Sequence, residues 1–379
     1  MTLRNLAWSL FWIVALAVPP SPASAVEKLA AEKGTADPAQ PLLWYDIRLL
    51  GVEGQGWTTD LKAPFDRLPA KAEGKAPASV WGLSHHSAGL AVRFVTDART
   101  IQARWTLIKP ELAMPHMPAT GVSGLDLYVK DAGNWRWLSV GQPRAQTNTA
   151  ALVSGLPAGE REYMLYLPLY NGVSNVELGI DKGAFLAIAD PRPETHRKPI
   201  LFYGTSITQG GCASRPGMVH TAILGRHLNY PVINLGFSGS GRMEAEMADL
   251  LAEVDPAVYV LDCLPNMDAK AVSERVVPFV KKLRAAHPQT PILLVEDRTY
   301  SNSFLISGSH QRNQTNRAAL EKAYQTLLAD GIQHLAYLHG EKLLGADGED
   351  TVDGSHPTDL GFLRQAEAME PALKKLLNP

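Results

Sequence analysis

Apolar and polar positions follow different patterns in the two halves of this chain. From about residue 41 to residue 187, short apolar or alternating segments are separated by turn residues. The clearest segments lie at 88–105, 125–129, 135–140, 162–169 and 173–179. Many short strands at turn-separated intervals predict an all-β sandwich or jelly-roll domain over residues 41–188.

After residue 198 the pattern changes to continuous apolar segments that alternate with helical ones. Five short apolar segments occur at 199–204, 231–237, 257–263, 291–297 and 335–340. Continuous apolar strands indicate burial on both faces, and hence a parallel sheet covered by helices. Within residues 320–328, apolar side chains recur at helical spacing, as expected of a covering helix. We therefore predict an α/β, flavodoxin-like domain with a five-stranded parallel sheet over residues 199–379.

The segment between these halves has neither pattern. Residues 189–199 hold three prolines and alternating charges with no apolar period. This composition is typical of a boundary, so we predict a linker at residues 189–198.

The N-terminus has the features of an export signal. Arg4 precedes an apolar run at residues 6–18, which is shorter than the ~20 residues that a spanning helix needs. Ala23-Ser24-Ala25 then supplies a small-residue cleavage site. We predict a signal peptide at 1–25, a short linker at 26–40, and export to the periplasm or the medium of a bacterium. A retained membrane anchor is the alternative.

Charge and cysteine content exclude several classes of protein. The chain carries 36 Lys and Arg against 38 Asp and Glu, a formal net charge of −2, without a basic run. Nucleic acid is therefore not an expected partner, because phosphate capture needs a basic face. No segment beyond residue 25 is long and apolar enough to span a bilayer. Two cysteines cannot build a disulfide scaffold, so apolar cores must supply the stability.

Candidate chemistry gathers where the predicted parallel strands end. Ser206 follows the first strand, Gly239 lies in a glycine-rich turn after the second, and Asn266 follows the third. Asp353 and His356 lie in the last loop before the final helix. Acyl transfer needs this set, because a serine hydroxyl requires a base and the base requires a carboxylate that orients it. The developing oxyanion needs preorganised donors, which a backbone N–H beside a glycine and an asparagine amide can supply.

The order Ser, Gly, Asn, Asp-x-x-His resembles the SGNH (GDSL-type) hydrolase superfamily over residues 199–377. The resemblance implies Ser206 as nucleophile, His356 as base and Asp353 as the residue that orients it. It also implies an oxyanion hole from the backbone N–H groups of Ser206 and Gly239 and the side chain of Asn266, with no metal and no organic cofactor.

The sequence departs from the family pattern at two places. Thr205 replaces the aspartate of the common Gly-Asp-Ser block. Leu264 and Met267 replace the glycine and aspartate that usually flank the asparagine, here Asn266. The oxyanion role is therefore less securely implied for Asn266 than the nucleophile role is for Ser206.

The first half carries a narrower resemblance. Residues 124–128 read Gly-Leu-Asp-Leu-Tyr, similar to the Gly-x-Asp-Leu-Tyr motif of a domain that precedes one SGNH subgroup. That subgroup resembles carbohydrate esterases, which implies an O-acyl and specifically an O-acetyl ester on a polysaccharide or oligosaccharide as substrate. Asp126 lies within a predicted strand, so we expect a structural role for it.

Several residues have alternative interpretations. Asp347 and Asp350 compete with Asp353, but only Asp353 lies three residues before His356. His116 is a possible substrate contact near the active-site rim.

Arg298 follows the fourth strand, so substrate contact and an ion pair with a neighbouring acid are equally open. His85 and His86 are adjacent in what we take for a strand, so they face opposite sides and do not share a metal ion. Cys212 and Cys263 follow neighbouring strand ends, which permits either a disulfide or two buried thiols.

The leading hypothesis is thus a serine esterase that acts on acylated glycans without a cofactor. A lipase or thioesterase is the alternative within enzymes, although the sequence shows no long apolar lid. A non-catalytic glycan-binding protein is the alternative outside enzymes, because six of the eight tryptophans lie between Trp44 and Trp137. A nucleotide or phosphate site is disfavoured, since the turn at 236–241 lacks G-x-G-x-x-G spacing and a Walker lysine.

Overall fold

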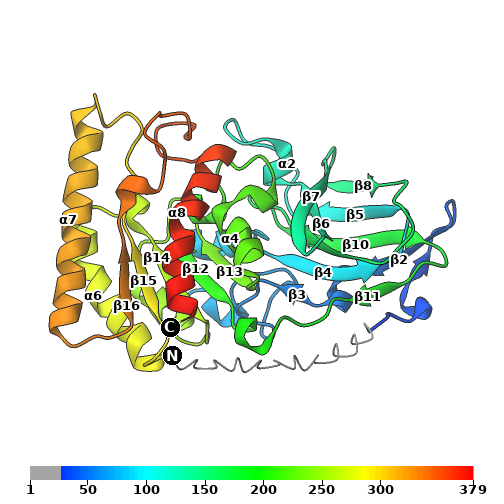
Figure 1. Cartoon of the computed structure of the whole chain (residues 1–379), viewed down its shortest axis with the longest axis horizontal. Helices are drawn as coiled ribbons and strands as arrows, with labels where there is room; N and C mark the ends of the chain where they lie inside the picture. The colour runs from blue at the N-terminus through cyan, green and yellow to red at the C-terminus, as the bar shows by residue number, and fades with distance from the viewer. Residues whose placement is uncertain (1–26, 379) are drawn as a thin grey trace, which may run out of the picture.

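A computed structural model describes residues 27–378 of the chain (Figure 1). The predicted signal peptide at 1–25 lies outside the described residues. Among residues 27–378, no helix combines the length and the apolar character that crossing a membrane requires. Strands are antiparallel as far as Ile188 and parallel from Ile200 onward. The domain boundary at 189–198 stays a prediction.

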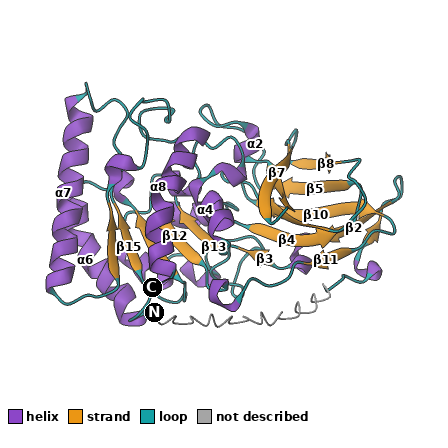
Figure 2. Cartoon of the chain, in the orientation of Figure 1, coloured by secondary structure: helices purple, strands orange, loops and turns teal. Residues whose placement is uncertain are grey.

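The first half is a sandwich of two antiparallel sheets (Figure 2). One sheet has the order β1-β2-β10-β5-β8, with bounds Thr35–Ala36, Leu42–Asp46, Val173–Asp181, Ile101–Leu107 and Thr147–Val153. The other has the order β11-β4-β9-β6-β7, with bounds Leu186–Ile188, Ala91–Thr96, Arg161–Tyr166, Leu125–Asp131 and Asn134–Gly141, and β3 (Val52–Glu53) pairs with β4. Their inner faces share one core that includes Trp105, Phe94 and Tyr163, as the alternating pattern predicts.

Two short helices belong to the connections of this half, α1 (Ala78–Ser84) and α2 (Ala119–Val122). Our placement of His85 and His86 in a strand is wrong, because His85 caps the C-terminal end of α1. The two rings nevertheless have separate partners. His85 contacts Asp66, and His86 contacts Gln209.

The second half is built on a parallel sheet in the order β13-β12-β14-β15-β16. The strand bounds are Val232–Gly236, Ile200–Gly204, Val258–Asp262, Ile292–Val295 and Leu335–Leu338. In chain order this is 2-1-3-4-5, so the predicted flavodoxin-like topology is confirmed. All residues of β12, β14 and β15 are buried, as their continuous apolar sequences predict.

Helices cover both faces of the parallel sheet (Figure 1). One face packs on α5 (Ala245–Leu251), α6 (Ala269–Ala286) and α7 (Ser307–Ala329). The other packs on α4 (His220–Leu228) and α8 (Asp359–Leu377). The apolar cluster on the α4 and α8 side also contains Met117, Tyr128 and Tyr166 of the sandwich, so the two halves share a core.

Candidate active site

The predicted nucleophile lies at the start of a short helix that follows the first parallel strand. β12 ends at Gly204, Thr205 caps the helix with its side chain, and α3 (Ser206–Gln209) begins at Ser206. Thr205 therefore caps the helix at the place of the usual aspartate of the family pattern. Gly236 lets β13 approach this helix closely, since a Cβ there would lie 2.1 Å from the Gln209 nitrogen.

Ser206, His356 and Asp353 form a continuous hydrogen-bonded row. Ser206 Oγ lies 2.8 Å from His356 Nε2, and His356 Nδ1 lies 2.8 Å from Asp353 Oδ2. The other carboxylate oxygen of Asp353 accepts from the backbone N–H of His356 at 2.8 Å and of Ser355 at 3.0 Å. Partial burial favours a higher pKa for Asp353, but these hydrogen bonds outweigh it and lower the pKa. Asp353 therefore stays a carboxylate that can hold the imidazole in one tautomer.

The two competing acids of this loop have other partners. Asp350 is buried and contacts Arg364 at 2.9 Å, and Asp347 contacts the same guanidinium at 2.7 Å. Both carboxylates therefore anchor the loop to α8, which contains Arg364.

The three predicted oxyanion donors come from separate loops at the same sheet edge. Gly239 is exposed in the turn after β13 and has a φ of +67°, a conformation that favours glycine. Among the described residues, neither the Ser206 N–H nor the Gly239 N–H donates to a protein acceptor. Asn266 ends a 3₁₀ turn (Leu264–Asn266) and donates from Nδ2 to Ser240 O at 2.7 Å. An amide nitrogen carries two hydrogens, so a second donor remains on Asn266.

The first half contributes side chains to this site that sequence reasoning missed. The Tyr170 hydroxyl donates to the backbone carbonyl of Ser206 at 3.0 Å. Gln209 accepts from the Ser238 N–H at 3.0 Å, beside Gly239, and donates to His86 Nδ1 at 3.0 Å. Burial and the nearby Lys109 charge lower the pKa of His86 to about 3, so the ring is neutral. Nothing in the sequence pattern places Tyr170 or His86 near Ser206.

Asp126 joins the sandwich to the loop that follows the nucleophile helix. Its buried carboxylate accepts from Gly217 N at 2.7 Å, from Arg215 Nη1 at 2.9 Å and from Trp137 Nε1 at 3.0 Å. Arg215 also donates to the Tyr128 hydroxyl at 2.5 Å. Two residues of the Gly-x-Asp-Leu-Tyr motif thus bind the second half directly.

Arg298 does not lie on the surface of the site, so its predicted substrate contact is wrong. The side chain is 0% exposed and donates from Nη2 to both carboxylate oxygens of Asp262, each at 3.0 Å. Asp297 lies 3.6 Å from its Nη1. Burial raises the pKa of Asp297 to about 6. The alternative interpretation, an ion pair with a neighbouring acid, describes this arginine.

Cys212 and Cys263 are both free and buried, so the structure does not contain the possible disulfide. The Cys263 thiol donates to the Tyr203 carbonyl at 3.5 Å. Burial and the nearby Asp353 charge raise the pKa of Cys212 to about 11. The two thiols therefore face different surroundings. Within residues 27–378, no group of three or more His, Cys, Asp or Glu side chains is arranged to hold a metal ion.

His116 is exposed on the loop between β5 and α2. Its neighbour Met117 is buried against Gly121 and the segment near Ala213, directly after the nucleophile helix. A role for His116 in substrate contact stays a prediction.

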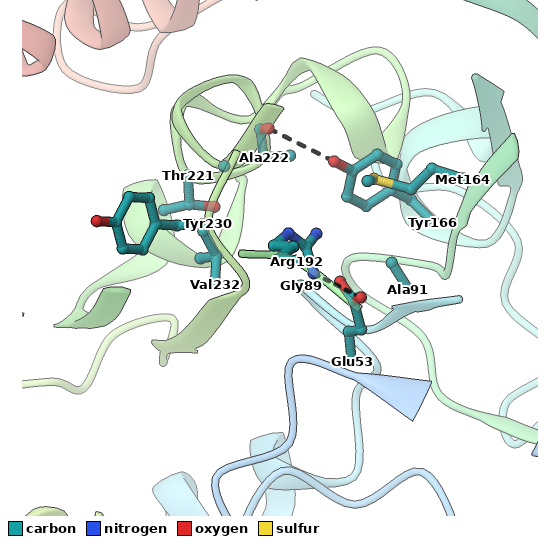
Figure 3. A pocket seen from close by; sticks show the side chains of 11 residues that line it. Glu53, Gly89, Ala91, Met164, Tyr166, Arg192, Thr221, Ala222, Tyr230 and Val232 are labelled. Atoms are coloured by element: carbon teal, nitrogen blue, oxygen red, sulfur yellow. Dashed lines mark hydrogen bonds and ion pairs between the residues drawn. The ribbon is translucent and has the colours of Figure 1, made fainter. Parts of the chain in front are cut away.

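A separate small pocket lies where the two halves meet (Figure 3). Arg192 donates to Glu53 at 2.6 Å there, and the Tyr166 hydroxyl donates to the Ala222 carbonyl at 3.5 Å. None of its lining residues belongs to the Ser206 site.

Comparisons with known proteins match both halves. The sequence profile of the GDSL-like lipase/acylhydrolase family matches residues 197–374. The profile of the N-terminus of SGNH-hydrolase-type esterases matches residues 42–186. The search of curated proteins found no match.

Three solved structures show the extent of the likeness. A protein from Bacteroides ovatus described as a GDSL-like lipase is 34% identical, with a TM-score of 0.84 over 89% of this chain and 98% of its own. The salicylyl-acyltransferase SsfX3 from a tetracycline biosynthetic pathway is 21% identical, with a TM-score of 0.70 over 90% and 96%. A family two carbohydrate esterase from Clostridium thermocellum, solved with cellohexaose, is 17% identical, with a TM-score of 0.57 over 76% and 93%.

Proposed function

The chain belongs to the GDSL-like, or SGNH, esterase family, and from that premise we propose that it is a serine esterase that removes O-acyl groups, chiefly O-acetyl groups, from a carbohydrate. The observation that carries the proposal is the row from Ser206 Oγ through His356 to Asp353, in which each contact is 2.8 Å.

In the proposed reaction, His356 first accepts a proton from Ser206 and then donates it to the leaving alcohol. His356 Nε2 takes the Ser206 proton as Oγ attacks the ester carbonyl carbon, and Asp353 stabilises the imidazolium. The backbone N–H groups of Ser206 and Gly239 and the side-chain amide of Asn266 hold the oxyanion. His356 then gives the proton to the departing alcohol, which leaves an acyl group on Ser206. Water attacks this ester with His356 as base, and the carboxylic acid and the free serine are regenerated.

One observation supports a glycan as the alcohol, and a second supports the esterase assignment. The solved family two carbohydrate esterase shares the fold, and its structure holds cellohexaose. The sandwich that precedes the hydrolase half matches the N-terminus of SGNH-type esterases. The export signal predicted at residues 1–25 is consistent with a polysaccharide substrate outside the cytoplasm.

The proposal is tested with Ser206→Ala and, as a control, Ser273→Ala, which alters an exposed serine on α6. Each protein is incubated with acetylated xylan and acetylated cello-oligosaccharides, and released acetate is measured by mass spectrometry. We expect Ser206→Ala to lose at least about 1,000-fold in kcat while Ser273→Ala keeps full activity. Full turnover by Ser206→Ala would refute the mechanism. Glycan binding without turnover by the native chain would favour a binding protein.

A lipase or acyltransferase is the second candidate within enzymes, and the same assay separates it. Long-chain 4-nitrophenyl esters cleaved faster than acetyl glycans would favour a lipase. Transfer of the acyl group to an added alcohol faster than to water would favour a transferase.

A further inference from the structure

Exposed apolar side chains gather on the two loops beside the predicted base. Residues 27–378 hold eight exposed large apolar side chains, and four of them lie on these loops. Phe304 is 87% exposed, Leu305 75%, Ile306 49% and Val352 48%. Single exposed apolar residues are ordinary, but a group of this kind marks a contact surface. We call these four side chains the apolar rim.

Hydrogen bonds fasten the loop at 299–306 to the loop that carries Asp353 and His356. Ser301 donates from its backbone N–H to Gly354 O at 2.9 Å, and Ser301 Oγ lies 2.9 Å from Thr351 Oγ1. The Val352 N–H donates to His356 O at 2.9 Å. Figure 1 shows both loops at the same edge of the parallel sheet, beyond the ends of β15 and β16. The rim is therefore placed by the same contacts that place the base.

Helix α7 also holds the first residues of the loop at 299–306. Tyr300 N donates to Asn313 Oδ1 at 2.9 Å, and Arg312 Nε donates to the Tyr300 hydroxyl at 3.2 Å, both from α7. Anchoring at Tyr300 and Ser301 fixes the start of a loop whose tip is presented to solvent.

The direction of proton transfer indicates which part of the substrate lies beside the apolar rim. In acyl transfer the base delivers its proton to the oxygen of the leaving alcohol, so the alcohol must lie against His356. The carbonyl oxygen points the other way, toward Ser206 and Gly239. A sugar ring presents an apolar face of C–H groups, which an aromatic side chain can cover.

We propose that the apolar rim binds the alcohol part of the substrate, by contact with the apolar face of the sugar that carries the ester or of its neighbour. The inference rests on the proposed esterase function and names the site that selects the alcohol. Phe304 and Leu305 supply most of the contact, because they are the most exposed of the four.

The test compares alcohols that carry the same acetyl group. Phe304→Ser/Leu305→Ser is measured on acetylated cellohexaose, acetylated xylohexaose and methyl acetate. The control is Leu328→Ser, which removes a 41% exposed apolar side chain near the far end of α7. We expect KM to rise about tenfold on the better hexaose with kcat unchanged, and no change on methyl acetate. The Leu328→Ser control should match the native chain on all three esters.

Each contrary result separates the two proposals. An unchanged KM on both hexaoses, or equal loss on methyl acetate, overturns the rim alone. A native chain that cleaves methyl acetate but neither hexaose also overturns the rim as a sugar contact. Sedimentation with phosphatidylcholine vesicles that Phe304→Ser/Leu305→Ser abolishes, with KM unchanged, identifies a lipid surface instead. A native chain inactive on all three esters overturns the esterase function and the rim with it.

Discussion

The hydroxyl of Tyr170 reaches the nucleophile helix from the other half of the chain. It donates to the Ser206 carbonyl at 3.0 Å and lies where a Cβ on Gly211 would approach within 2.8 Å. Burial raises the pKa of Tyr170, so the phenol keeps its proton at every physiological pH. The Ser206 carbonyl also accepts from Gly210 N and Gly211 N, so the tyrosine completes an existing turn. We therefore regard Tyr170 as a positioning residue.

Replacing Tyr170 by Phe should lower kcat about fivefold and leave KM unchanged, because one hydrogen bond worth about 1 kcal/mol no longer fixes the helix. The matched control is Tyr163→Phe in the sandwich core, which should leave both constants unchanged. Steady-state kinetics on the acetylated glycan checks both. A rise in KM at constant kcat would instead assign Tyr170 to substrate binding.

At the residue scale, the sequence predicts which side chains belong to the site in two cases. Either the residues are close together in the chain, or each follows a strand that ends at the same edge of the sheet. Asp353 and His356 are three positions apart, and Ser206, Gly239 and Asn266 each follow a parallel strand. Tyr170 and His86 are 36 and 123 positions from their partners Ser206 and Gln209. Such contacts depend on how the two halves pack. Arg298 is buried within the second half, against Asp262 at the end of the neighbouring strand β14, and the sequence alone did not distinguish this ion pair from a substrate contact.

At the scale of elements, β6 binds the loop that follows the nucleophile helix. Asp126 on this strand accepts three hydrogen bonds, two of them from Gly217 and Arg215. Burial raises the pKa of Asp126, and the Arg215 charge and the Gly217 N–H oppose that rise. The structural role of Asp126 is therefore to connect the two halves by hydrogen bonds and an ion pair. The 3₁₀ turn at Pro216–Met218 is thereby held against the sandwich.

Asp126→Asn should lower the free energy of unfolding by about 3 kcal/mol, because Arg215 loses its buried counter-charge. The control Asp131→Asn lies on the same strand and removes an exposed ion pair with Arg136, so its effect should stay below about 1 kcal/mol. Urea unfolding measures both. Equal stability of the two variants would show that Asp126 does not hold the loop.

The sequence predicts a strand well where the strand is apolar throughout. It predicts a strand poorly where the strand forms only because it pairs with a distant one. β12, β14 and β15 read as continuous apolar runs and were predicted within about two residues. β8 has a mixed sequence, Thr-Asn-Thr-Ala-Ala-Leu-Val, and forms by pairing with β5, some forty positions earlier. No local pattern predicts β8, because the strand with which it pairs is remote in the sequence.

At the scale of the molecule, Arg67 joins the two halves. Its fully buried guanidinium donates to Asn234 O and Gly236 O on β13, each at 2.9 Å, and to Leu83 O at the end of α1 at 2.7 Å. It also lies over the ring of Phe237, 4.8 Å from the centroid. Burial lowers the pKa of Arg67 to about 9. An arginine from the first half thus closes the outer edge of the parallel sheet.

Arg67→Met should therefore separate the unfolding of the two halves as well as lower stability. The methionine fills similar volume but leaves four carbonyl acceptors without this donor, at a cost of about 1 kcal/mol or more each. Native protein should unfold in a single transition, because the halves share an apolar cluster and this arginine. Arg67→Met should show two transitions in urea, one followed by loss of esterase activity and the other by the loss of the circular dichroism signal that remains once activity is gone. The control Arg48→Met removes an exposed pair with Asp46 and should keep the single transition. One coincident transition in Arg67→Met would mean that the shared cluster alone couples the halves.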